Sequence, residues 1–149
     1  MQAEHAKSTV YFDGSCPLCR AEIGYYRRQD RSGALCFVDV SEPDALVPDG
    51  LTQQQAMERF HVRGGDGSLV SGAAAFVQVW ARLPRWRWVA RTAAIPGILA
   101  LLELGYRLFL PARPVLASVF GRINPLWERH DDVKRPSRFR NRIRALTRR

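Results

Sequence analysis

Two cysteines three residues apart, Cys16 and Cys19, are the side chains of this sequence best suited to chemistry. Such a pair can cycle between a dithiol and a disulfide. The pair follows the apolar run 10–12 and the turn residues 13–15, and Pro17 favours the first position of a helix. We therefore predict that Cys16 is the N-cap of a helix and that Cys19 is its third residue.

A helix that begins at Cys16 would stabilise a thiolate on this residue. The thiolate can accept a hydrogen bond from the backbone N–H of Cys19, and the helix dipole favours its negative charge. In such settings the pKa of a cysteine falls from about 8.5 to roughly 3.5–7.5. The sequence therefore favours redox chemistry, with an exposed Cys16 as the attacking thiolate and a less exposed Cys19 as the resolving thiol.

The same spacing also occurs in half of a structural zinc site, and two cysteines can lie three residues apart without any chemistry. A four-ligand zinc site needs a second pair of ligands. The remaining candidates form no pair with metal-ligand spacing; they are Cys36, His5, His61 and His130. We therefore expect no metal and no cofactor, and we expect Cys36 to be a buried apolar residue of a strand.

Asp13 lies three residues before Cys16, and two interpretations of it stay open. It can be a turn residue whose carboxylate caps backbone N–H groups. It can also be a catalytic residue that accepts the proton of Cys19 during resolution. A carboxylate beside Cys16 would raise the pKa of that thiol, so activation of Cys16 is not assigned to Asp13.

The segments around the cysteines predict an α/β fold with the thioredoxin-like order β-α-β-α-β-β-α and extra C-terminal helices. The apolar run 34–40 is typical of a strand that is buried on both faces. The predicted elements are a strand at 8–12, a helix at 16–30, a strand at 34–40, a helix at 51–57, a hairpin of 60–63 with 68–71, and a helix from 73. This order places the cysteines where the thioredoxin fold keeps its redox site.

Beyond residue 83 the sequence predicts helices that a minimal thioredoxin lacks. The apolar stretch 98–110 contains Glu103 and Arg107 at the i,i+4 spacing of a helical ion pair. It is shorter than the uninterrupted apolar segment that a membrane-spanning helix needs. We expect it to pack on the sheet or to lie across the site, to end at Pro111 and Pro114, and to be followed by a short helix at 115–120.

The net charge of +9 is concentrated at the C-terminus. Residues 134–149 carry eight basic and no acidic residues, which leaves 15 basic and 14 acidic residues in the first 133 positions. We expect one domain over 8–120 and a basic extension over 121–149 that is partly disordered. The alternative is that 134–149 contact an anionic membrane surface or nucleic acid. Three cysteines and an N-terminus without an apolar core indicate a cytoplasmic location, with membrane association as a second expectation.

The segment from Asp13 to Cys19, placed after a short strand, resembles the DCC family of predicted thiol-disulfide oxidoreductases, which is named for its D-x-x-C-x-x-C pattern. The resemblance extends to 66–75 and to the apolar helical region that follows, so that it covers about residues 8–120. It implies a thioredoxin-like fold and dithiol–disulfide exchange. Thioredoxins hold their substrate chain with a cis-proline before the third strand, whereas 53–62 contains no proline here.

The sequence therefore predicts a thiol-disulfide oxidoreductase, in the cytoplasm a protein-disulfide reductase, with Cys16, Cys19 and Asp13 at its site. Its substrate would be a disulfide-containing protein or a small thiol. The alternative is a non-enzymatic thioredoxin-like adaptor that docks to anionic lipid or nucleic acid through its basic tail. The substitution Cys16→Ser separates the two, because it should abolish an enzymatic function and leave adaptor binding intact.

Overall fold

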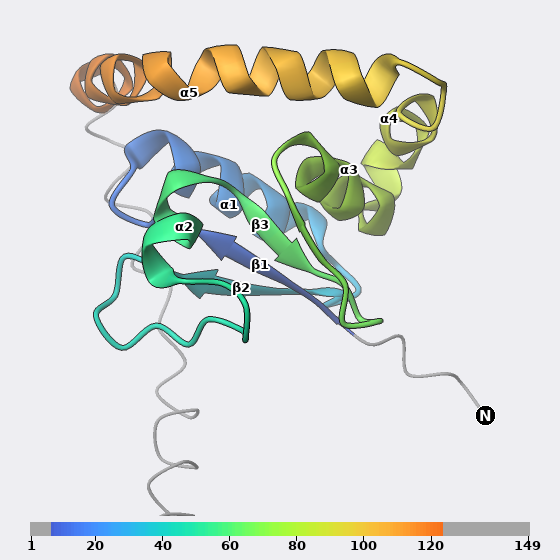
Figure 1. Ribbon diagram of the computed structural model, residues 1–149, viewed down its shortest axis with the longest axis horizontal. Coiled ribbons are helices and arrows are strands. Elements are labelled where there is room, and N and C mark those ends of the chain that lie inside the picture. The colour runs from blue at the N-terminus through green and yellow to red at the C-terminus, as the bar shows by residue number, and fades with distance from the viewer. Residues whose placement is uncertain (1–6, 124–149) are drawn as a thin grey trace, which may run out of the picture.

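The computed structural model describes residues 7–123, which form a four-stranded sheet with helices on both faces (Figure 1). The strands are β1 (Ser8–Phe12), β2 (Leu35–Asp39), β3 (His61–Arg63) and β4 (Leu69–Ser71), in the spatial order β2-β1-β3-β4. β1 and β2 are parallel, whereas β3 is antiparallel to both β1 and β4. The predicted β-α-β-α-β-β-α order and the thioredoxin-like α/β class are confirmed.

All helices except the short one at 53–58, which packs with Tyr11 on the other face, form two layers on one face of the sheet. The helices are α1 (Pro17–Gln29), α2 (Gln53–Glu58), α3 (Ala73–Arg82), α4 (Arg87–Thr92) and α5 (Ile98–Ile123), with a 3₁₀ turn at Pro84–Trp86. α1 and α3 cover the sheet, and α5 lies across both of them on the side away from the sheet (Figure 1). The predicted extra helix therefore packs on the helical layer and not on the sheet itself.

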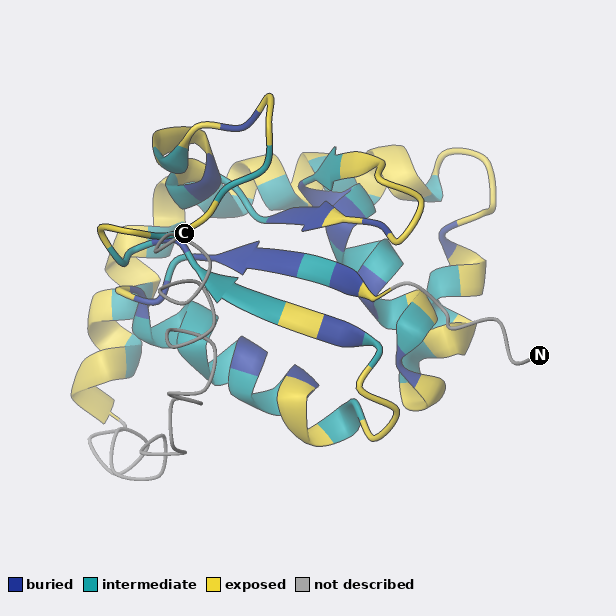
Figure 2. Ribbon diagram, turned by 90° about the horizontal axis from the view of Figure 1, so that it is seen from below, coloured by how far each residue is buried: buried dark blue, intermediate teal, exposed yellow. Residues whose placement is uncertain are grey.

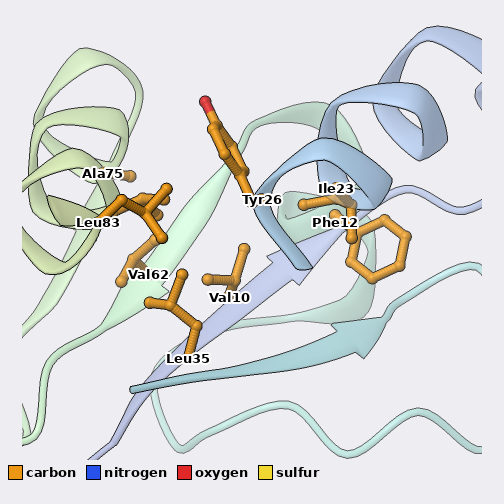
Figure 3. Packing of buried hydrophobic residues seen from close by; sticks show 9 residues of the cluster. Val10, Phe12, Ile23, Tyr26, Leu35, Val62, Ala75 and Leu83 are labelled. Atoms are coloured by element: carbon orange, nitrogen blue, oxygen red, sulfur yellow. The ribbon is translucent and has the colours of Figure 1, made fainter. Parts of the chain in front are cut away.

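The alternation of side chains along β1 divides the core between the two faces of the sheet. Val10 and Phe12 point toward α1 and α3, where they pack against Ile23, Tyr26 and residues of β3 and α3 (Figure 3). Tyr11 points to the opposite face. There it packs with a smaller cluster, formed by Val40, Leu51 and Ala56, that closes one end of the sheet.

The prediction that the strand at 34–40 is buried on both faces is wrong, and so is the predicted burial of Cys36. β2 is an edge strand, and on its side toward α1 Leu35 is buried and Phe37 is partly buried against the main core. Cys36 points to the other face, where the small cluster around Tyr11 does not reach it. Cys36 is exposed, in agreement with the exposed stretch that Figure 2 shows on an edge strand of the sheet.

The prediction that Pro111 and Pro114 end the apolar helix is also wrong, because α5 runs through both of them to Ile123. A proline inside a helix removes one backbone hydrogen bond and crowds the preceding turn. Contacts of α5 with α1 and α3 outweigh this local cost. Residues 124–149, which carry the predicted basic tail, lie outside the described residues.

The side chain of Glu103 links α5 to the start of α3 through hydrogen bonds. Its Oε2 accepts a hydrogen bond of 3.0 Å from the backbone N–H of Ala73, the first residue of α3. Its Oε1 accepts from Arg59 Nη2 at 2.5 Å and from Arg107 Nε at 3.0 Å, which confirms the predicted ion pair with Arg107. Gly72 has a φ of 64°, and a Cβ there would collide with Glu103 and Arg59. The junction therefore requires glycine at this position.

The substitution Glu103→Gln should lower the free energy of unfolding by about 1–3 kcal/mol at neutral pH. Burial raises the pKa of Glu103, but the Ala73 N–H and the two arginines outweigh burial and bring the pKa to about 2. Since this pKa is depressed on folding, the stabilisation is present above about pH 4.3 and is lost as the pH falls toward 2.

Urea unfolding of wild type and Glu103→Gln across this pH range measures the effect, with the exposed Glu58→Gln as the control. The difference in free energy between wild type and Glu103→Gln should shrink with acidification. A difference that is constant with pH would show that the charge of Glu103 does not stabilise the junction.

Candidate active site

The cysteine pair lies where the sequence predicted it, at the amino end of α1. Cys16 is the N-cap, with extended backbone angles, and Pro17 occupies the first helical position. The preceding turn is tied to the end of β2, because the backbone N–H of Gly14 donates to Asp39 Oδ1 at 2.9 Å. A Cβ on Gly14 would collide with the carboxylate of Asp39, so the turn needs glycine to come this close.

The exposure of the two thiols is the reverse of the prediction. Cys16, predicted to be exposed, is only 7% exposed, whereas Cys19 is half-buried. The physical reason is α5, whose carboxyl-terminal part lies over the start of α1. Near its end, a Cβ on Gly121 would lie 3.6 Å from the ring of Pro17. The extra helix therefore covers the thiol that a minimal thioredoxin-like domain would leave open.

The two thiols have pKa values that move in opposite directions. The hydrogen bond from the Cys19 thiol lowers the pKa of Cys16 most; burial opposes it, and the Cys19 backbone N–H and the Arg113 guanidinium lower it further, to about 5. The same bond to Cys16, together with burial, raises the pKa of Cys19 far above its ordinary value. At neutral pH the reduced pair therefore holds a thiolate on Cys16 and a proton on Cys19.

Arg113 of α5 is a site residue that the sequence analysis missed. Its Nη2 pairs with Asp13 Oδ2 at 2.5 Å, and its Nη1 donates to the carbonyl of Met57 at 3.2 Å. The side chains of Arg113 and Asp13 are only 17% and 12% exposed. In the sequence, Arg113 stands between Pro111 and Pro114 in an apolar segment. This pattern indicated the end of a helix, and it gave no sign that the arginine is largely buried at the site.

Asp13 makes the contacts of a turn residue and also holds Arg113. Its Oδ1 accepts hydrogen bonds from the backbone N–H of Ser15 at 2.9 Å and from the Ser15 hydroxyl at 2.5 Å. Its Oδ2 is taken by Arg113. The interpretation of Asp13 as a turn cap is confirmed, while its role as proton acceptor for Cys19 stays a prediction.

A pocket opens beside Cys19, with about 490 Å³ of empty volume that includes open solvent. It lies between α1, α5 and the segment that joins α2 to β3. Its walls are mostly aromatic and aliphatic, and the charged side chains that line it are Asp13, Glu22, Arg59 and Arg113. A reacting group that enters this pocket would therefore meet Cys19 in apolar surroundings.

Glu22 is the second residue that the sequence analysis missed. It follows Cys19 by three positions on α1, so both side chains are on one face of the helix and line the same pocket. Its Oε1 accepts a 2.7 Å hydrogen bond from the hydroxyl of Tyr26, which in turn accepts from Trp80 Nε1 at 3.1 Å. Burial raises the pKa of Glu22, and the bond from Tyr26 opposes that shift. The i,i+3 spacing was the signal that could have identified it.

The other candidate ligands do not gather around the cysteine pair. Within residues 7–123 no three histidine, cysteine, aspartate or glutamate side chains are placed to hold a metal ion. His61 Nδ1 is hydrogen bonded to the carbonyl of Arg59 at 2.8 Å, and Cys36 lies on the open part of β2. His5 and His130 lie outside the described residues.

Comparisons with known proteins agree with this geometry. A family model described as DCC1-like thiol-disulfide oxidoreductase matches residues 10–119. A curated relative, an uncharacterized chloroplastic protein of Arabidopsis thaliana, is 29% identical over 122 residues, which is 76% of this chain and 56% of the relative. The chain thus spans little more than half the length of that relative. No solved structure matches the chain significantly.

The substitution Arg113→Gln should raise the pKa of Cys16 above its value of about 5, by about one unit or more. The ultraviolet absorbance of the thiolate, followed against pH in the reduced protein, measures this midpoint. A Cys36→Ser background removes the signal of the exposed thiol. The control Arg107→Gln changes an exposed arginine of the same helix and should leave the midpoint unchanged. A midpoint that Arg113→Gln leaves at about 5 would contradict the assignment.

Proposed function

Because the chain belongs to the DCC1-like thiol-disulfide oxidoreductase family, we propose that Cys16 and Cys19 exchange a disulfide with a substrate. The observation that carries this proposal is the asymmetric pair itself. A thiolate on Cys16 and a retained proton on Cys19 are held side by side at the N-terminus of α1. This is the protonation state from which one thiol attacks and the other resolves.

In the first step the Cys16 thiolate attacks one sulfur of a substrate disulfide. A bond forms between Cys16 Sγ and that sulfur, the substrate S–S bond breaks, and the other substrate sulfur leaves as a thiolate. In the second step Cys19 loses its proton and attacks Cys16 Sγ. The Cys16–Cys19 disulfide forms, the second substrate thiolate leaves, and two electrons have passed to the substrate.

Glu22 is the proposed acceptor of the Cys19 proton. It shares the pocket with Cys19, and because burial raises its pKa, its carboxylate is a stronger base than that of an exposed glutamate. Both oxygens of Asp13 already accept hydrogen bonds from Ser15 and Arg113, which weakens Asp13 as a base. The proposed role of Asp13 is therefore to position Arg113 next to Cys16.

The proposed direction is reduction of the substrate, which is a disulfide-containing protein or a small disulfide. Either substrate reacts only when Cys16, which is 7% exposed, becomes accessible. The few cysteines of the chain are typical of a reducing compartment, and the cytoplasm is the proposed location. The relative is described as chloroplastic. A cellular thiol would supply the two electrons that restore the dithiol.

The assignment of the two thiols can be tested by trapping the mixed disulfide. With oxidised glutathione as the probe, Cys19→Ser should accumulate a glutathione adduct on Cys16, because the resolving thiol is absent. Cys16→Ser should lose turnover, and Cys36→Ser should keep it, since Cys36 lies on the opposite face of the sheet. Intact-protein mass spectrometry after acid quenching counts the adducts in a Cys36→Ser background, which removes the exposed thiol. An adduct that forms on Cys19 in Cys16→Ser, with none in Cys19→Ser, would reverse the two roles.

The role of Glu22 predicts a defect in the second step alone. Glu22→Gln should slow release of the substrate thiol by about 10²-fold or more, because the proton acceptor is lost while the shape is kept. Rapid-quench kinetics should show normal formation and slow decay of the mixed disulfide. Glu58→Gln, an exposed glutamate outside the pocket, is the control. Unchanged decay in Glu22→Gln would exclude Glu22 as the acceptor.

A further inference from the structure

α5 is apolar on the side that faces away from the rest of the fold. The residues of this outer face recur at the helical spacing of three, four and seven and are between 46% and 68% exposed; they are Leu101, Leu104, Leu108, Val115 and Val119. No other element of residues 7–123 lies on this side of the helix (Figure 1). A helix that is apolar on both its inner and outer faces is ordinarily covered on both, so an exposed stripe of this length indicates a binding surface.

The charges around this face are almost all positive. From residue 84 to residue 123 the sequence has six arginines and one acidic residue, Glu103. Arg113 is largely buried against Asp13 on the inner side of α5. The five exposed arginines are Arg107 and Arg122 on α5 itself and Arg85, Arg87 and Arg91 in the segment before it. Glu103 is directed inward, where it is bound by Ala73, Arg59 and Arg107. The outer face therefore presents leucine and valine beside exposed arginines, and residues 134–149 add eight basic residues and no acid to the sequence after it.

We propose that the outer face of α5 docks on an anionic membrane surface, with Leu101, Leu104 and Leu108 inserted into the interface and the flanking arginines on lipid headgroups. An amphipathic helix with a basic border binds such surfaces through apolar burial and electrostatic attraction together. No helix among residues 7–123 is long and apolar enough to cross a bilayer. In the proposed docking, α5 lies in the plane of the interface.

A second copy of the chain fits this face less well. Pairing two outer faces would bring the exposed arginines of both copies together, without an acidic residue of the face to neutralise them. An anionic bilayer supplies both the apolar cover and the opposite charge. Docking would leave the inner side of α5 on α1 and α3, with Arg113 still paired with Asp13, so the dithiol would lie beneath the membrane-bound helix.

Vesicle flotation of the full chain tests this proposal independently of any redox activity. Wild type should float with vesicles of phosphatidylcholine and phosphatidylglycerol, and much less with phosphatidylcholine alone. The triple variant L101Q/L104Q/L108Q should lose about tenfold or more in partition coefficient, because its apolar burial is lost while every charge is kept. Circular dichroism and urea unfolding establish that the variant is folded. Leu46→Gln changes a leucine that is 73% exposed and lies far from α5 in sequence, and it is the matched control.

Three outcomes would overturn the proposal. Binding of the triple variant equal to that of wild type would mean that basic residues alone attract the vesicles, as they would attract nucleic acid. Equal binding to both vesicle types would contradict the role of the arginines. A wild type that fails to float but sediments as a dimer, and becomes a monomer in the triple variant, would assign the face to a second copy of this chain.

Discussion

The buried ion pair between Asp13 and Arg113 is the interaction on which the site depends. It joins the turn before the cysteines to a helix one hundred residues later, and both side chains are largely removed from water. Removing one partner of such a pair leaves a buried charge without compensation, at a typical cost of about 3–5 kcal/mol. The pair therefore fixes α5 over the start of α1 and brings a guanidinium to the Cys16 thiolate. The ion pair between Asp13 and Arg113 thus determines both where α5 lies and which charge faces Cys16.

This arrangement combines activation of Cys16 with its protection. Arg113 and the helix N-terminus stabilise the thiolate, yet the helix that carries Arg113 covers the thiol. A substrate must therefore approach through the pocket beside Cys19 or displace the end of α5. Stabilisation of the thiolate also favours the reduced state of the pair, which raises its potential relative to that of an unperturbed dithiol. The added helix is thus part of the redox site.

Local sequence signals predicted the part of the fold that contains the cysteines. The run 8–12, the turn with Gly14 and the proline after Cys16 each favour one conformation, and the chain adopts it. The predictions that failed concern tertiary structure. Burial of Cys36 depended on strand order, because the same apolar run at an edge is covered on one face only. The continuity of α5 through its prolines, and the meeting of Arg113 with Asp13, depend on packing between distant segments that no local pattern encodes.

A redox titration of the full chain in glutathione buffers measures whether Cys16 and Cys19 form a reversible redox pair. The oxidation state of Cys16 and Cys19 is followed by alkylation and mass spectrometry, and Cys16→Ser is the control. We predict a reversible two-electron transition that this substitution abolishes. Its midpoint should fall when Arg113 is replaced by glutamine, because the reduced state loses its stabilising cation. Thiols that stay reduced across the whole range of buffers would contradict a redox-active pair.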